Sequence, residues 1–257
     1  MPYVESSGVQ IHYEVEGRGP SVIFEHGITD AMDSFYEAGY VEGLQGDYRL
    51  LFIDARGHGK SGAPHNSAAY LTEQRVADVL AVMDAEGVEK TVYYGFSLGG
   101  ITGFTLAHLH PERLNGLIIC GMHARSRRLV RGFIEEQARA FRELGIRGVL
   151  EKRESQHGPL SPERRERFLA LDPLAIAAAW EAVGEWDGVE EALPTMATPA
   201  LIIVGDQDTE YRETAPRDAG RMPNARFVSI PGLDHVQSFD RTDLVLPHIR
   251  EILDRVS

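Results

Sequence analysis

Three residues in widely separated segments have the side chains that an activated nucleophile needs. Ser97 lies within the sequence G-F-S-L-G, after an apolar run typical of a strand and before an apolar-periodic run typical of a helix. A serine at such a turn is held in a strained backbone conformation that presents its hydroxyl, and the flanking glycines avoid contacts that a Cβ would make. Asp208 and His235 each follow a later apolar run. We therefore expect Ser97 to act as a nucleophile.

A histidine and an acid could supply the proton transfer that a neutral serine requires. In this arrangement His235 takes the Ser97 proton and later protonates the leaving group, while Asp208 fixes the histidine tautomer and stabilises the imidazolium. The chain order serine, aspartate, histidine differs from the orders found in two other serine-protease architectures. Asp206 precedes Asp208 in the same loop and remains the alternative acid.

The apolar pattern predicts a scaffold that would bring these loops together. Short apolar runs, mostly separated by helical patterns, are typical of a parallel sheet that is covered by helices on both faces. In such a sheet, functional residues collect in the loops that follow the carboxyl ends of the strands. The predicted fold class is therefore α/β, with a mostly parallel, doubly wound sheet. The predicted strands occupy residues 21–24, 49–53, 91–94, 114–120, 200–204 and 226–230.

Periodicity places two further elements. Apolar residues alternate with polar ones over residues 9–15, which predicts a half-buried strand in an early hairpin that closes near residues 17–20. From Leu98 to Leu109, apolar residues recur at helical spacing until Pro111 ends the pattern. A helix should therefore follow Ser97 directly.

Composition excludes several classes of function. The net charge of −13 disfavours binding to nucleic acid or to an anionic membrane surface, so a small molecule is the expected partner. No apolar run approaches the ~18 residues of a membrane span, and the N-terminal residues lack the features of a signal peptide. The single cysteine, Cys120, excludes an internal disulfide and is expected to be buried. We therefore expect the protein to reside in the cytoplasm.

Cofactor motifs are missing from the sequence. It contains no recognisable zinc-ligand spacing and no dinucleotide or Walker-type glycine fingerprint after a strand. We therefore expect neither a cofactor nor a metal. The oligomeric state is left open, with a homo-oligomer as one option, although no heptad pattern or large apolar stripe argues for it.

Five short segments carry a resemblance to a known family. The chain resembles the α/β-hydrolase superfamily over nearly its whole length. The resemblance implies an acid at the end of a G-x-x-D pattern, which selects Asp208, and a histidine at the end of a G-x-x-H pattern, which selects His235. It also implies an oxyanion hole formed by the backbone amides of Ile28 and Leu98. The five segments are His26-Gly27, residues 54–61, the turn at Ser97, residues 205–208 and residues 232–235.

The stretch around Ser97 is most similar to small carboxylesterases and 3-oxoadipate enol-lactonases. This resemblance implies a serine hydrolase that cleaves a carboxylic ester or lactone bond of a small molecule through an acyl-serine intermediate. A serine here argues against epoxide hydrolases and haloalkane dehalogenases, whose family position carries an aspartate nucleophile. Thioesterase, cofactor-free perhydrolase and carbon–carbon bond hydrolase activities remain alternatives. So does a ligand-binding receptor of the same fold that turns over slowly or not at all.

Residues 122–195 show helical patterns without a clear strand. The resemblance implies that they form a helical cap, inserted into an α/β-hydrolase core of residues 1–121 and 196–257. A cap at this place would cover the site, exclude water and set the shape of the substrate. Arginines cluster at its start, where they are expected to form a solvated helix face or, alternatively, to attract a carboxylate-bearing substrate. These arginines are Arg125, Arg127, Arg128 and Arg131.

Three residues near the predicted site are expected to have structural roles. His26 and His58 belong to turns that organise loops. Glu25 occupies a strand-end position that is usually apolar in the family, and a carboxylate facing the oxyanion hole would oppose the developing negative charge. We expect its side chain to be a solvated charge at a sheet edge, pointing away from the site, or to be paired.

Overall fold

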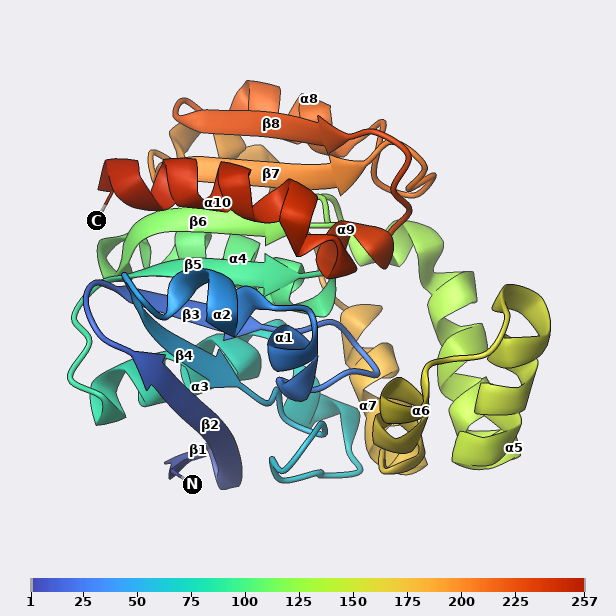
Figure 1. Ribbon diagram of the computed structural model, residues 1–257. Helices are drawn as coiled ribbons and strands as arrows, with labels where there is room; N and C mark the ends of the chain where they lie inside the picture. The colour runs from blue at the N-terminus through green and yellow to red at the C-terminus, as the bar shows by residue number, and fades with distance from the viewer. Residues whose placement is uncertain (1, 257) are drawn as a thin grey trace.

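The computed structural model of the protein describes residues 2–256, and an eight-stranded sheet runs through its centre (Figure 1). The strands stand in the order β1-β2-β4-β3-β5-β6-β7-β8. Neighbouring strands from β4 to β8 are parallel, whereas β2 pairs antiparallel with both β1 and β4. The strand bounds are β1 (Tyr3–Ser6), β2 (Val9–Gly17), β3 (Ser21–Glu25), β4 (Arg49–Ile53), β5 (Thr91–Phe96), β6 (Leu114–Cys120), β7 (Ala200–Gly205) and β8 (Ala225–Ile230).

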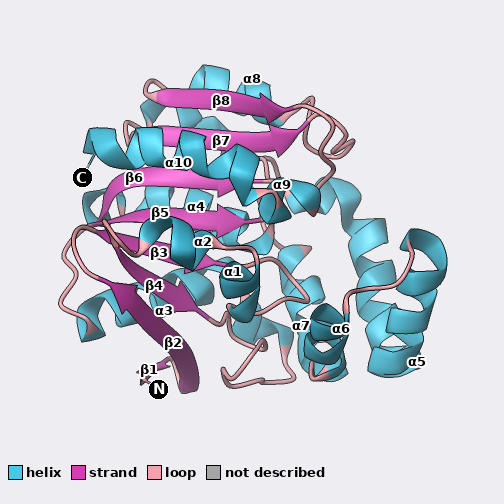
Figure 2. Cartoon of the chain, viewed as in Figure 1, coloured by secondary structure: helices cyan, strands magenta, loops and turns pink. Residues whose placement is uncertain are grey.

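Helices cover both faces of this sheet (Figure 2). Helices α1, α2, α9 and α10 lie on one face, and α3, α4 and α8 lie on the other. Their bounds are α1 (Asp33–Glu37), α2 (Tyr40–Leu44), α3 (Thr72–Ala85), α4 (Leu98–Leu109), α8 (Ala215–Arg221), α9 (Gln237–Asp240) and α10 (Thr242–Val256), and short 3-10 turns lie at η1 (Ser67–Tyr70), η2 (Pro111–Arg113), η3 (Arg127–Val130) and η4 (Glu190–Thr195).

Two hydrophobic cores separate the sheet from its helical layers. Successive side chains of a strand point to opposite faces. In β3, Val22 and Phe24 pack with the apolar side chains of α1, α2 and α10, whereas Ile23 packs with those of α3, α4 and α8. Cys120 at the end of β6 is also buried. Burial on both faces explains the continuous apolar runs of the sequence, and the predicted doubly covered, mostly parallel sheet is confirmed.

The prediction of the early hairpin was wrong in its turn. Strand β2 forms its hairpin with β1 through Ser7 and Gly8, and the glycine-rich segment after β2 leads instead into β3, which pairs with β4. Gly17 has a φ of 69°. A Cβ at Gly17 would lie 2.3 Å from the carbonyl oxygen of Tyr48. The glycine therefore serves a close approach to the chain before β4 rather than a hairpin turn.

Three helices are inserted between β6 and β7 and lie beyond the carboxyl ends of the strands (Figure 1). Helix α5 changes direction at Gly145, which has a φ of 64°. The small residues of α7 pack against Tyr70 and Ile28, so the insertion rests on loops of the sheet. None of the helices described between residues 2 and 256 is long and apolar enough to cross a membrane. The inserted helices are α5 (Arg131–His157), α6 (Pro162–Leu169) and α7 (Pro173–Val183).

Candidate active site

Ser97 forms a strained turn between β5 and α4, as the sequence predicts. Its φ of 50° and ψ of −105° lie outside the regions that residues with a Cβ prefer, at a cost of about 1–3 kcal/mol. The flanking glycines permit the turn to close. A Cβ at Gly95 would lie 2.2 Å from the carbonyl oxygen of Gly99, and a Cβ at Gly99 would lie 2.4 Å from that of Glu25. The backbone contacts therefore require glycine on both sides of Ser97.

Asp208, and not Asp206, contacts His235. The Nδ1–H group of His235 donates a hydrogen bond of 2.8 Å to Oδ2 of Asp208, whose side chain is buried. Asp206 instead accepts a hydrogen bond of 2.8 Å from the backbone amide of Gly232, which joins the loops after β7 and β8. The two acids therefore have different contacts: Asp208 binds the imidazole of His235, whereas Asp206 binds the loop that carries His235.

Aromatic rings and a glycine hold the imidazole of His235 in place. The ring centroids of Phe96 and Tyr211 lie 4.9 Å and 5.3 Å from that of His235. Gly121, at the end of β6, has a φ of 63°. A Cβ at this position would lie 2.8 Å from Cε1 of His235, so the space for the ring depends on the glycine. The imidazole is therefore confined on several sides.

The amides of Ile28 and Leu98 lie at the two backbone segments that meet near Ser97. The amide of Ser97 donates to the carbonyl of Cys120 at 2.9 Å, and that of Gly99 donates to the carbonyl of His26 at 3.2 Å. The amides of Ile28 and Leu98 are not among the backbone donors that bond to protein groups in the described chain.

His26 and His58 bridge loops and stand outside the cavity. Nε2 of His26 accepts a hydrogen bond of 3.1 Å from the amide of Ala55. Nε2 of His58 accepts one of 3.2 Å from the amide of Thr29. Burial lowers the pKa of His58 to about 3, which keeps its ring neutral and able to accept this bond. The structure gives both histidines the loop-organising contacts that we expected.

Ser97 and His235 line one cavity of about 300 Å³ between the sheet and the inserted helices. An adjoining cleft of about 790 Å³ shares His235 with it and is also lined by Asp208. Within residues 2–256, no group of three or more His, Cys, Asp or Glu side chains is placed to hold a metal ion. From the inserted segment, the lining residues of the smaller cavity are Arg127, Phe133, Arg153, Leu160, Arg164, Arg167, Phe168 and Trp180.

The arginines that line the cavity are mostly not those that the sequence singled out. Of the expected cluster, Arg127 lines the cavity, whereas the other three are surface residues whose guanidinium groups contact acids within the insertion or the segment after it. Arg128 on η3 and Arg131 on α5 are exposed, as a solvated helix face requires, but Arg125 lies in a bridge with Gly188 and Arg127 is buried. The expected helix face therefore holds for only two of the four arginines. Sequence reasoning missed Arg164 and Arg167, which lie one turn apart on α6, because helical spacing alone does not show which face of α6 turns inward. It also missed Arg153 and Trp180.

The expectation that Glu25 is a solvated edge charge was wrong, whereas the expectation of pairing was right. Its side chain is 2% exposed and accepts hydrogen bonds from the hydroxyls of Tyr93 and Thr102. Burial raises the pKa of Glu25 to about 7, while the Tyr93 hydrogen bond and the charge of Arg75 oppose this rise. The error arose because β3 lies at the centre of the sheet, between β4 and β5.

Several known proteins with a similar chain are hydrolases. A 3-oxoadipate enol-lactonase from Acinetobacter baylyi is 26% identical over 78% of this chain and 76% of its own. The structure of an enol-lactonase from Burkholderia xenovorans superimposes with a TM-score of 0.86 at 26% identity, covering 98% of this chain and 100% of that one. A malate-bound thermophilic esterase from Thermogutta terrifontis gives a TM-score of 0.82 at 25% identity, covering 99% and 98% of the two chains. The profile of the alpha/beta hydrolase fold family matches residues 20–242, and the protein therefore belongs to that family.

Proposed function

We propose that the protein is a serine hydrolase that cleaves a carboxylic ester or lactone bond of a small molecule through an acyl-serine intermediate at Ser97. One observation carries this proposal: Ser97 and His235 line the same cavity, and His235 is hydrogen-bonded to the buried carboxylate of Asp208. The similarity to an esterase and to enol-lactonases supports the same reaction class. The catalytic residues in this proposal are Ser97, His235 and Asp208.

The acylation step follows from these contacts. Oγ of Ser97 attacks the carbonyl carbon while Nε2 of His235 takes the hydroxyl proton, and Asp208 stabilises the resulting imidazolium through Nδ1. The carbonyl oxygen becomes negative and accepts hydrogen bonds from the amides of Ile28 and Leu98, each contributing about 3 kcal/mol to lowering the barrier. The carbon–oxygen bond then breaks, and His235 gives its proton to the leaving alkoxide. An alcohol and an acyl-serine result.

Hydrolysis of the acyl-serine repeats the same steps with water. His235 takes a proton from a water molecule that attacks the acyl carbon, and it returns the proton to Oγ of Ser97 as the carboxylic acid leaves. A lactone follows the same course, except that the alcohol remains attached to the acyl group and the product is a hydroxy acid.

We further propose that residues 122–195 form a cap on a core of residues 1–121 and 196–257. Such a cap would limit the access of bulk water to the intermediate.

A time course with p-nitrophenyl esters from acetyl to octanoyl tests this proposal. The wild-type protein should release many equivalents of nitrophenol, and Ser97→Ala should abolish the release. Ser155→Ala is the matched control, because this exposed serine lies on α5 and donates a hydrogen bond only within its own helix. Mass spectrometry during turnover should show the acyl group on Ser97.

Three results would contradict the proposal. Equal rates for the wild type and Ser97→Ala would exclude the acyl-serine mechanism. Release of a single equivalent per chain would instead favour a binding protein that reacts once and is not regenerated. If the esters are inert while thioesters or carbon–carbon bonds are cleaved, the residues act in another reaction of the same family.

A further inference from the structure

The cavity that contains Ser97 has an excess of positive charge in its wall. Four guanidinium groups line it, against two carboxylates among the described residues. The arginines come from η3, α5 and α6, so three separate elements of the insertion contribute them. The arginines are Arg127, Arg153, Arg164 and Arg167, and the carboxylates are Asp30 and Glu210.

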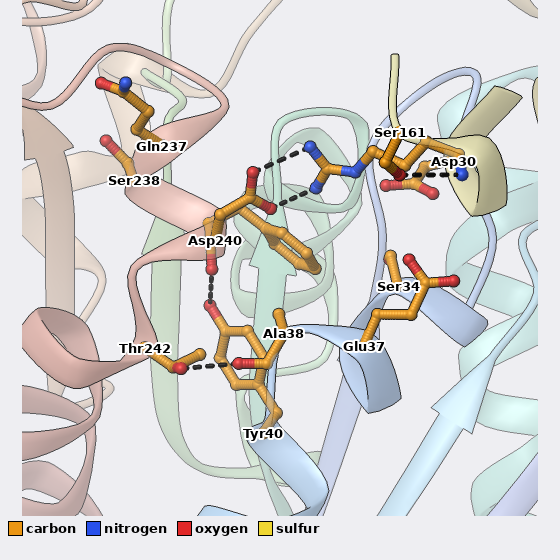
Figure 3. A network of polar contacts seen from close by, with 12 residues as sticks. Asp30, Ser34, Glu37, Ala38, Tyr40, Ser161, Gln237, Ser238, Asp240 and Thr242 are labelled. Carbon is orange, nitrogen blue, oxygen red and sulfur yellow. Dashed lines mark hydrogen bonds and ion pairs between the residues drawn. The ribbon is translucent and has the colours of Figure 1, made fainter.

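Three of the four arginines contact carboxylates. Two of the acids involved, Glu37 and Asp240, do not line the cavity, so they offset the positive charge from outside it. Figure 3 shows the carboxylate of Asp240 in contact with a guanidinium group, with Asp30 on the other side of that group. The pairs are Arg127 with Glu210 at 2.7 Å, Arg164 with Asp240 at 2.8 Å, and Arg167 with Asp30 at 2.9 Å and with Glu37.

Arg153 differs from the other three because none of the described carboxylates forms an ion pair with it. Its Nη1 donates a hydrogen bond of 3.2 Å to the carbonyl oxygen of Gly158. Partial burial lowers the pKa of the Arg153 guanidinium, Glu154 raises it and Arg164 lowers it. Arg153 lines both the cavity and the adjoining cleft, which places it where the two meet. Of the four arginines, Arg153 is therefore the one that a ligand carboxylate would pair with most favourably.

Three residues that line the same cavity each have an unpartnered hydrogen-bond donor. Among the described side chains, four buried polar atoms lack a partner, and three of them belong to residues that line this cavity. Buried N–H groups are rarely left unpaired, because their desolvation is costly. Guanidinium and indole N–H groups donate only, so a ligand that satisfies them must supply acceptors. The three atoms are Nε of Arg127, Nη2 of Arg167 and Nε1 of Trp180.

We infer that the substrate carries a carboxylate in addition to the bond that is cleaved, and that Arg153 binds this carboxylate with help from Trp180. The inference deepens the proposed function and rests on it for the identity of the reaction. A planar guanidinium can donate two parallel hydrogen bonds to a carboxylate, which both attracts and orients the ligand. Binding at Arg153 would position the reacting carbonyl at Ser97.

Matched esters separate charge from chain length. The substrates are mono-p-nitrophenyl esters of glutaric, adipic and suberic acids, and the controls are the same compounds with the second carboxylate capped as a methyl ester. For at least one chain length, the free acid should have a kcat/KM about tenfold or more above that of its capped partner, the difference expected of one charge-assisted hydrogen bond. Equal values at every length, with Ser97-dependent turnover of both, would overturn the inference and leave the proposed function intact.

Two variants and one control assign the preference to residues. Arg153→Met should reduce the ratio of kcat/KM for acid over capped ester towards one, and Trp180→Phe should reduce it in part. Arg165→Met is the control, since Arg165 lies on α6 but does not line this cavity. It should retain the wild-type ratio. A ratio that Arg153→Met leaves unchanged would exclude Arg153 as the carboxylate-binding residue.

A binding measurement does not depend on turnover. Glutarate, adipate and suberate should bind to Ser97→Ala in calorimetry, and the additional change Arg153→Met should weaken binding about tenfold or more. Such binding would support the carboxylate site even if no ester were hydrolysed, a result that would contradict the proposed function alone. Absence of dicarboxylate binding would overturn the inference. Tighter binding of inorganic phosphate than of any dicarboxylate would likewise overturn the assignment to a carboxylate.

Discussion

The hydroxyl oxygen of Tyr93 lies 2.9 Å from the carbonyl oxygen of Gly99, which joins β5 to the first turn of α4 next to Ser97. The same hydroxyl contacts the carboxylate of Glu25. A phenol has one proton to donate. When Glu25 is protonated, its carboxyl group can donate a hydrogen bond to the Tyr93 oxygen, and the Tyr93 hydroxyl can then donate to the carbonyl of Gly99. When Glu25 is ionised, it accepts the hydrogen bond from the Tyr93 hydroxyl instead. The protonation of Glu25 therefore decides how the turn at Ser97 is supported.

The first prediction concerns the pH dependence of stability at Glu25. Burial raises its pKa from 4.5 to about 7 in the folded protein, so the folded state binds more protons than the unfolded state between these values. The stability that this group contributes is complete below pH 4.5 and is lost as the pH rises through about 7. Glu25→Gln should lack this loss. The melting temperature of the variant relative to the wild type should rise between pH 5 and pH 8, and a constant difference would contradict the prediction.

The second prediction concerns His58, whose contribution to stability changes with pH in the opposite direction to that of Glu25. Its pKa is lowered from 6.5 to about 3, so the unfolded state binds more protons between these values and the protein loses stability as the pH falls through this range. Between pH 7 and pH 5, His58 should account for a loss of about 2 kcal/mol, at ~1.4 kcal/mol per pKa unit. Urea unfolding of the wild type and His58→Gln at both pH values measures this.

A second buried histidine limits how much the His58 variant can change. Burial and the charge of Arg127 lower the pKa of His123 to about 4, so this residue contributes acid sensitivity of the same sign. The His58→Gln variant should therefore keep part of the acid sensitivity. If the variant and the wild type lose the same free energy of unfolding on acidification, the His58 ring is not neutral in the folded protein.

The third prediction uses Gly121 to displace His235 without altering it. A Cβ at Gly121 would lie 2.8 Å from Cε1 of His235, and the positive φ disfavours alanine there. Gly121→Ala should lower kcat on p-nitrophenyl esters by about tenfold or more, because small displacements of a catalytic base are costly. Gly132→Ala is the control, since a Cβ there meets nothing within 4 Å. Unaltered kcat in folded Gly121→Ala would show that the ring does not need this space.

The fourth prediction concerns the contacts that hold α6 to the sheet. Arg164 on α6 pairs with Asp240 on α9 (Figure 3). The two side chains are 25% and 32% exposed, so the pair should contribute about 0.5–1 kcal/mol. Asp240→Asn should lower the melting temperature by about 2 °C and hasten protease cleavage within residues 158–172. Asp243→Asn, which loses a pair between neighbours on the surface, should leave cleavage there unchanged.

The sequence alone singles out the three residues of the proposed triad, because each follows a strand with a strong local pattern. Ser97 has its glycines, and Asp208 and His235 stand in loops after apolar runs. All of these loops lie at one edge of a parallel sheet, so the fold class implies their proximity without further information. The residue pattern alone leaves open which of two acids contacts the imidazole, and the hydrogen bond of Asp208 with His235 answers that.

The failures have a common physical origin in the order of elements in space. The sequence suggests that Glu25 is a charge at a sheet edge, but β3 pairs with both β4 and β5, and this central position buries the side chain. The order of strands in a sheet cannot be inferred from a local stretch of sequence. Arg153 lies on α5 and Trp180 on the mostly buried α7, and which of their side chains line the cavity depends on how the insertion docks. The segment after β2 contains glycines because the backbone there passes close to the chain before β4. Glycines at a hairpin turn produce the same sequence pattern, so the two cases cannot be told apart from the sequence.

Helix α7 links one wall of the cavity to the segment that carries Ile28. Trp180 on α7 lines the cavity, and the alanines of the same helix pack against Ile28. We expect a ligand that contacts the indole to restrain α7 and, through these alanines, Ile28, whose amide we propose as an oxyanion-hole donor. Discrimination between good and poor substrates should then appear in the rate of bond breaking as well as in affinity, so that a poorly seated molecule binds and leaves unreacted.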